Sequence, residues 1–349
     1  MRLVRHLVVG LSVAALAAWS AATVAHEFWI EPSSFQLRPE ERVDFRLCIG
    51  NGGDAWAVAR DASRIETFAA VGPDGQVSVP GLQGSDPAGV ARFTEPGGYV
   101  VAYETNHART TQTAAQFDEY LLEVGLETIA AARHKRGDGV RSVREAYSRH
   151  AKALLAVGGE PTPPQDHAVG LRLELILDGS QPTSRGMDES TFRLLHLGRP
   201  LAGALVTAVG LGSGSALQQA RSDVRGRVSF TLRRGETWRI TAVHMVRGDR
   251  DLGADWESLW ASLVFDLPAD TVRRHDAVRR CAAPASRTTN MSRIDHDIVP
   301  PPLPLLLLLP QLVSPVIVAP VRLNRKIVPL PQRPPLLVVP MNSVALALS

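Results

Sequence analysis

Short stretches of alternating apolar and polar residues dominate the first third of the chain. Residues 42–47 alternate in this way, and residues 97–103 form a second strand-like run rich in valine and tyrosine. Glycine, asparagine, aspartate and proline cluster between the runs, at residues 50–54 and 72–75. A period of two bounded by turn residues predicts half-buried β-strands, and the spacing is typical of an antiparallel β-sandwich.

The hydrophobic period changes between residues 113 and 157. Apolar residues recur there at intervals of three and four, which predicts two amphipathic helices. The first group is Phe117, Tyr120, Leu121, Val124 and Ile129, and the second is Val143, Tyr147, Ala151, Leu154 and Leu155. Glycines at 137–139 separate the groups, and the pair at 158–159 is a plausible helix stop. We therefore predict a β-rich N-terminal domain, residues 26–160, that contains two helices.

A proline-rich stretch, residues 161–167, follows as a stiff polar linker. Strand-like runs then return between residues 168 and 267 at nearly regular spacing, with turn signals between them and no helical period. This pattern predicts a second, C-terminal β-sandwich. The expected fold class is mainly β, with two Ig-like sandwich domains and a short helical insertion.

Residues 1–25 have the layout of a secretion signal. Arg2 and Arg5 precede an uncharged apolar run, which ends in a small-x-small sequence at Ala25. Cleavage after Ala25 would make His26 the first residue of an exported, periplasmic protein. The alternative is an uncleaved N-terminal anchor, because the apolar run is nearly long enough to span a membrane.

Residues 268–349 differ from the rest in composition. Proline and leucine dominate, and no acidic residue follows Asp297. Each proline removes a backbone donor and interrupts helices and inner strands. We expect a disordered tail, with a membrane anchor as the alternative, and the abrupt change suggests the product of a frameshift.

Charge argues against nucleic acid as a partner. The net charge of the whole chain is +3, but residues 26–267 hold 26 basic and 31 acidic residues. The expected mature core is therefore mildly acidic and has no basic stripe for a phosphate backbone. Two cysteines do not make a disulfide framework, and Cys48, in a strand-like run, is expected to be a buried thiol.

The stretch that begins at His26 carries the candidate chemistry. A free α-amine and the imidazole Nδ1 of an N-terminal histidine can chelate one metal ion, because an α-amine titrates near ~8 and a metal can displace its proton. The competing interpretation is an ordinary surface histidine. A further ligand from elsewhere in the chain would complete the site.

Three stretches together resemble one family, DUF4198, a domain of unknown function. They are residues 26–32, residues 147–155, and the run 242–246 that leads to the tryptophan-rich segment 255–263. The resemblance covers about residues 26–267. It implies export, two β-rich domains and handling of a transition metal, since these periplasmic proteins are often labelled as cobalt- or nickel-uptake components. Residues 198–206 and the motif Asp223-x-x-Gly226 also resemble a transthyretin-like or carboxypeptidase-regulatory-like sandwich.

His244 is the candidate second ligand, since it lies near the end of a predicted strand and could reach the rim of a sandwich. Its competing interpretation is a half-buried, hydrogen-bonded histidine. Two imidazoles and an amine suit Ni(II), Co(II), Cu(II) or Zn(II). His107 is a weaker third candidate, and His134, His150 and His196 are interpreted as surface or packing residues. Asp249, Asp251 or Asp255 could orient an imidazole.

These observations predict an exported transition-metal-binding protein with His26 and His244 as ligands, and a membrane metal transporter as its partner. No nucleophile elbow, P-loop or dinucleotide fingerprint is present, so we expect no enzyme. The alternative is a β-sandwich module that binds protein or glycan without metal, and a copper oxidase is a third hypothesis. The sequence does not determine the oligomeric state.

Overall fold

Three β-sheets form the framework of the computed structural model, which describes residues 27–51, 54–159, 165–183, 186–212, 217–249, 251–269 and Cys281. Sheet A contains β1 (Glu27–Pro32), β3 (Arg42–Asn51), β4 (Asp54–Val58) and β7 (Gly89–Arg92). Sheet C contains β11 (Leu173–Pro182), β12 (Met187–His196), β13 (Arg199–Pro200) and β16 (Arg227–Arg233). The mainly β fold predicted from the sequence is confirmed.

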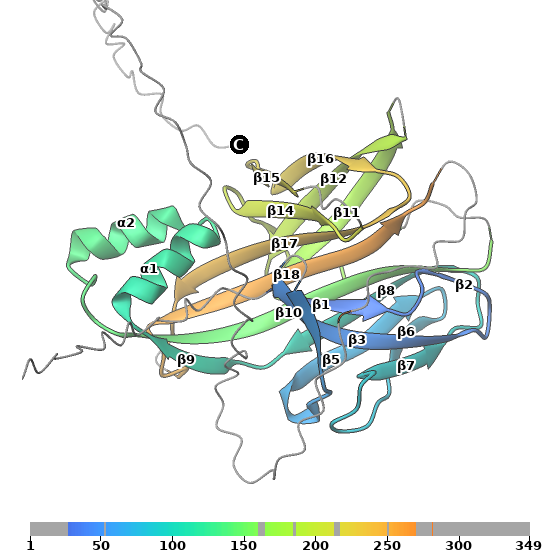
Figure 1. Cartoon of the computed structure of the whole chain (residues 1–349), viewed down its shortest axis with the longest axis horizontal. Coiled ribbons are helices and arrows are strands. Elements are labelled where there is room, and N and C mark those ends of the chain that lie inside the picture. Colours follow the sequence, from blue (N-terminus) through green and yellow to red (C-terminus); the bar gives the residue numbers. More distant parts are fainter. Residues whose placement is uncertain are drawn as a thin grey trace, which may run out of the picture. The chain divides into compact units, whose positions relative to one another are not determined.

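A 10-stranded central sheet lies between sheets A and C. Its long path runs β15-β14-β17-β18-β10-β8-β5-β6, and β2 and β9 pair with β10. The strands are β2 (Gln36–Leu37), β5 (Ile65–Gly72), β6 (Gly75–Ser78), β8 (Gly97–Thr105), β9 (Ala108–Gln112), β10 (Val143–Val157), β14 (Leu205–Gly210), β15 (Leu217–Arg221), β17 (Glu236–Arg247) and β18 (Trp256–Leu267). Figure 1 shows β10, β17 and β18 running through the middle of the fold.

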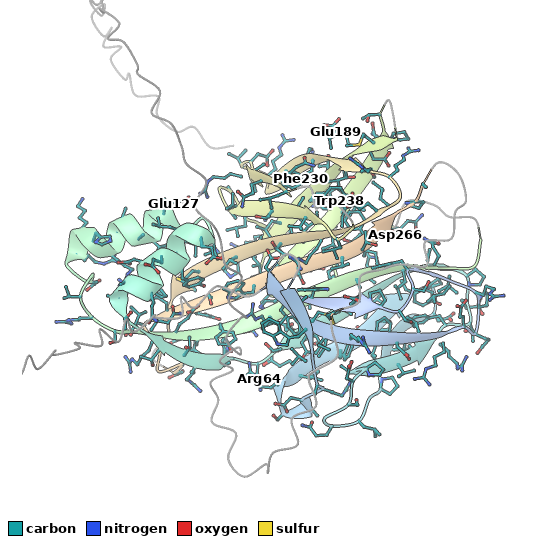
Figure 2. All side chains as sticks on the ribbon, viewed as in Figure 1. Arg64, Glu127, Glu189, Phe230, Trp238 and Asp266 are labelled. Carbon is teal, nitrogen blue, oxygen red and sulfur yellow. A yellow bond between two sulfur atoms is a disulfide. The ribbon has the colours of Figure 1, made fainter. Side chains whose placement is uncertain are left out.

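The two faces of the central sheet carry different cores. On β10, Ala151, Ala153 and Leu155 belong to the core shared with sheet A, whereas Leu154 belongs to the core shared with sheet C. Successive side chains of a strand point to opposite faces, so sheets A and C cover opposite sides of the central sheet. Phe230 and Trp238 lie in the core beneath sheet C (Figure 2).

Two helices cover the face of the central sheet that also carries sheet A. They are α1 (Ala114–Glu123) and α2 (Glu127–Arg136), and their core includes Met245 and Trp256 from β17 and β18. A capping box of Thr113 and Gln116 starts α1. The first predicted helix is thus present, but Gly125, with φ 76°, divides it into two.

The second predicted helix was wrong, because residues 143–157 form β10. This strand pairs with β18 in parallel and with β8 and β9 in antiparallel. Both of its faces are buried, so apolar residues occupy odd and even positions alike. That continuous run contains an accidental helical period, and pairing with four strands, β2 among them, outweighs the helix propensity of its alanines and leucines.

Cys48 is buried as expected, but it is not a free thiol. It forms a disulfide with Cys281, 233 residues later in the chain. The backbone N–H of Cys281 donates to both carboxylate oxygens of the buried Glu31, at 3.2 Å each. Cysteine spacing alone could not predict this bond, because it joins β3 to a segment beyond the last strand. The remainder of the predicted tail after residue 269 lies outside the described residues.

Candidate functional site

Four histidines converge on the face of the central sheet that carries sheet C. His244 lies on β17 and His150 on β10, while His107 follows β8 and His196 ends β12. We call them the histidine cluster. On β17, His244 continues the row of Ile240 and Ala242, which pack beneath sheet C. The histidine cluster thus lies next to the apolar core between the central sheet and sheet C, toward the rim of this sandwich.

His196 and His244 make the closest contact between two imidazoles that the described residues show. Their ring centroids are 4.5 Å apart, and the rings are tilted by 59°. Burial lowers the pKa of His196. Burial and then the neighbouring His196 lower the pKa of His244 to about 4, although Glu257 opposes the shift. At neutral pH both rings are therefore neutral, which is the form that binds a metal ion.

Glu257 on β18 connects this pair to His107. Its Oε1 lies 2.8 Å from Nε2 of His107, and its charge acts on both His196 and His244. Nη1 of Arg172 also lies 3.2 Å from the same imidazole nitrogen and 3.9 Å from Oε1 of Glu257. A guanidinium therefore provides the positive charge next to this carboxylate.

Glu104 contacts His150, the most deeply buried histidine of the cluster. It accepts a 2.7 Å hydrogen bond from Nε of Arg172, and Nδ1 of His150 lies 3.2 Å away. Burial alone would raise the Glu104 pKa, but the contacts with His150 and Arg172 outweigh it and lower the pKa to about 2. His150 is fully buried, its other ring nitrogen lies 2.9 Å from Oγ of Ser148, and burial lowers its pKa. His150 is thus held as a neutral packing residue, as the sequence indicated.

The other predicted ligand, His26, lies just outside the described residues. Its neighbour Glu27 accepts a 2.8 Å hydrogen bond from Thr241 and forms an ion pair with the buried Arg239. These two β17 side chains alternate with Ile240 and Ala242, so they point to the opposite face from His244. A cavity of about 430 Å³ opens on that face, next to Glu27, Arg239 and Trp260. The pairing of His26 with His244 stays a prediction.

Asp255, one of the aspartates expected to orient an imidazole, pairs with an arginine. Asp255 is held by Arg144, whose Nη2 lies 3.1 Å from its Oδ1, so the carboxylate beside the imidazoles is Glu257 instead. Glu257 and Arg172 were not predicted from the sequence, and His196 was expected to be structural. A carboxylate inside the apolar run of β18 was the one signal that could have indicated Glu257.

The described residues contain one set of three potential metal ligands whose atoms all lie within 4.8 Å of one another, namely Glu31, Cys48 and Cys281. The disulfide removes both thiolates, which are the forms that bind metal. The neutral imidazoles of His196 and His244, with the carboxylate of Glu257, are more suitable donors for a borderline transition metal. Bringing Glu257 to the same ion would require its side chain to move from His107.

Comparison with known proteins identifies the family. The family model "Domain of unknown function (DUF4198)" matches residues 23–246, which is well over half of the chain. The protein therefore belongs to the DUF4198 family. No curated protein sequence matches it. No helix among the described residues is long and apolar enough to cross a membrane.

Among solved structures, the D0–D1 domain of intimin is similar at 14% identity and a TM-score of 0.18, covering 69% of this chain and 97% of that one. A variant of Salmonella alpha-2-macroglobulin is similar at 13% identity and a TM-score of 0.16. The match covers 70% of this chain and 15% of the alpha-2-macroglobulin chain. These scores are too low to support an argument about function.

Proposed function

We propose that the protein is an exported, periplasmic transition-metal-binding protein whose site is centred on His196 and His244. The contact between these two imidazoles, with centroids 4.5 Å apart, is the observation that carries the proposal. Because both rings are neutral at neutral pH, no proton has to be displaced from them before a metal binds. Glu257 would supply the third ligand once its side chain moves away from His107.

The donor set favours Ni(II), Co(II), Cu(II) or Zn(II) over calcium or magnesium, which prefer oxygen ligands. The role we infer is capture of the ion and its transfer to a membrane metal transporter, without catalysis. The resemblance to cobalt- and nickel-uptake components supports this role. If the second half is a transthyretin-like sandwich, as its sequence resemblance implies, we infer that the imidazole pair lies at the rim of that unit.

Calorimetric titration of metal-stripped protein with Ni(II) and Zn(II) at neutral pH tests the proposal. We expect binding of one ion per chain, weakened about tenfold or more by His244→Gln, which corresponds to at least ~1.4 kcal/mol. His134→Gln is the matched control, since His134 is an exposed histidine on α2. If the wild-type protein gives no binding heat with either metal, the proposal is wrong.

His26 is tested separately by comparing the chain that begins at His26 with one that retains Ala25. If the terminal amine is a ligand, as the sequence predicts, the longer chain binds about tenfold more weakly or worse. Equal affinity of the two chains would show that the α-amine of His26 is not a ligand.

A further inference from the structure

A second group of charged side chains lies deep inside the fold, and its lysine follows His150 by two residues on the same face of β10. Lys152 on β10, Asp166 within the predicted linker and Glu174 on β11 have side chains that are 1%, 0% and 2% exposed. Nζ of Lys152 lies 2.7 Å from Oδ1 of Asp166 and 3.1 Å from Oε1 of Glu174. An ion triad this deep is costly, because each charge has been removed from water.

The lysine nitrogen has more acceptors than it has protons. Besides the two carboxylates, the carbonyl oxygens of His167 and Leu175 lie 3.0 and 3.1 Å from Nζ. An ammonium has three N–H groups, so at most three of these four oxygens can each accept a separate N–H from the nitrogen. The closest oxygen belongs to Asp166, which brings a primary amine against a carboxyl group.

We propose that Lys152 and Asp166 react within the folded protein to form an amide cross-link, with Glu174 as the proton carrier. A proton can pass between two groups this close, and burial favours the uncharged form of the Asp166 carboxyl group because it penalises charge. In agreement with this, burial raises the pKa of Asp166 despite the opposing effect of Lys152.

The reaction balances as the loss of one water. One ammonium proton passes to Oδ1 of Asp166, which leaves a neutral amine facing a carboxylic acid. The amine then attacks Cγ, so the N–C bond forms. Glu174 takes a second proton from the nitrogen and returns it to Oδ1, which departs as water when the C–O bond breaks. The nitrogen keeps its third proton as the amide N–H.

The surroundings fit these roles. The backbone N–H of Leu177 donates to Oδ2 of Asp166 at 2.9 Å, and it would stabilise the negative charge that develops on this oxygen during attack. The backbone N–H groups of Val169 and Gly170 donate to Glu174 at 2.7 and 3.0 Å and hold its carboxylate beside the lysine. Positioning by such fixed donors is what an intramolecular reaction requires.

The cross-link would tie the central strand of the fold to the segment that enters sheet C. Unlike the disulfide of Cys48 and Cys281, it would survive reducing agents. It would also be independent of metal binding, since none of its residues belongs to the histidine cluster.

Tryptic mapping of the purified full chain tests the proposal, because trypsin cuts after Arg149, Lys152 and Arg172. Without the cross-link, residues 150–152 and 153–172 separate into two peptides. With it, Lys152 is not cut, and residues 150–172 appear as one peptide that is lighter by one water. Two separate peptides of full mass would overturn the proposal. So would a lighter 153–172 peptide with Lys152 cut, since that product is an Asp166 succinimide.

Glu174→Gln is the decisive variant, because residue 174 lies outside both peptides and their masses stay the same. We expect this variant to give the two separate peptides. A circular-dichroism melt shows whether it folds. A folded Glu174→Gln protein that still carries the cross-link would contradict the role of Glu174 in the proposal.

Discussion

His196 and His244 come from different sheets, yet their rings meet with centroids 4.5 Å apart. His196 ends β12 of sheet C, and His244 lies on β17 of the central sheet. The two strands bring their polar ends together at the rim, where the apolar core of this sandwich stops. Neither imidazole alone is unusual, but two neutral rings in contact beside a carboxylate form a donor set for a metal.

A double-mutant cycle should show that the two histidines act as one unit. We expect His196→Gln and His244→Gln each to weaken Ni(II) binding about tenfold or more, and the double variant to be little worse than either single one. The reason is that a chelate is lost when either arm is removed. Strictly additive losses, measured by calorimetry, would show two independent sites instead.

Acid should destabilise the protein in two separate pH windows. The pKa of His244 is about 4 in the folded protein and about 6.5 in an exposed histidine, so only the unfolded chain takes up this proton between those values. Its contribution is complete above pH 6.5 and is lost as the pH falls toward 4. Partial exposure limits it to below ~3 kcal/mol. The Glu104 pKa of about 2 adds a second loss between pH 4.5 and 2.

The measurement is the free energy of unfolding in urea as a function of pH. His244→Gln should reduce the slope between pH 6.5 and 4, while the buried His150 and the partly buried His196 retain part of it. His134→Gln, at an exposed position on α2, is the control variant. An unaltered slope in His244→Gln would mean that His244 titrates normally in the folded protein.

Arg172 should contribute more to stability than an exposed arginine. Arg172→Gln removes the cation that pairs with Glu104 and leaves that carboxylate less compensated, which we expect to cost about 1–3 kcal/mol. Arg193→Gln is the control, since Arg193 pairs with Asp178 at the surface and should cost less than about 1 kcal/mol. Equal urea midpoints for the two variants would contradict this interpretation of the cluster.

The disulfide between Cys48 and Cys281 should stabilise the fold. Cys281→Ser should lower the free energy of unfolding by about 2–4 kcal/mol, because the cross-link no longer restricts the unfolded chain. Reduction of the wild-type protein should give the same loss. A chain that ends at residue 281 should keep full stability, whereas one that ends at residue 268 should match Cys281→Ser. Thiol titration of the unreduced, unfolded protein should detect no free cysteine.

The sequence predicted the β-rich character, because most strands alternate and are bounded by turns. Residues 97–103 lie within β8, and residues 42–47 begin β3. The prediction failed at β10, since burial on both faces replaces alternation with a continuous apolar run. A central strand of this kind is the hardest element to recognise, because its pattern is set by sheets far away in the chain.

The candidate site was predicted only in part for a similar reason. His244 could be proposed from its place near a strand end, and His107 was a weaker candidate. The contact between His244 and His196 depends on how sheet C packs on the central sheet, and no local sequence pattern indicates that packing. The same holds for Arg172, since it reaches Glu104, His107 and Glu257 only in the folded chain.

The most direct test counts the imidazoles bound to the metal. Pulsed electron paramagnetic resonance of the Cu(II)-loaded protein reports each coordinated imidazole through its remote nitrogen. We predict two imidazoles from His196 and His244, with one lost in either glutamine variant and both lost in the double variant. A Cu(II) spectrum that is the same in the wild-type and double-variant proteins would contradict the proposed site.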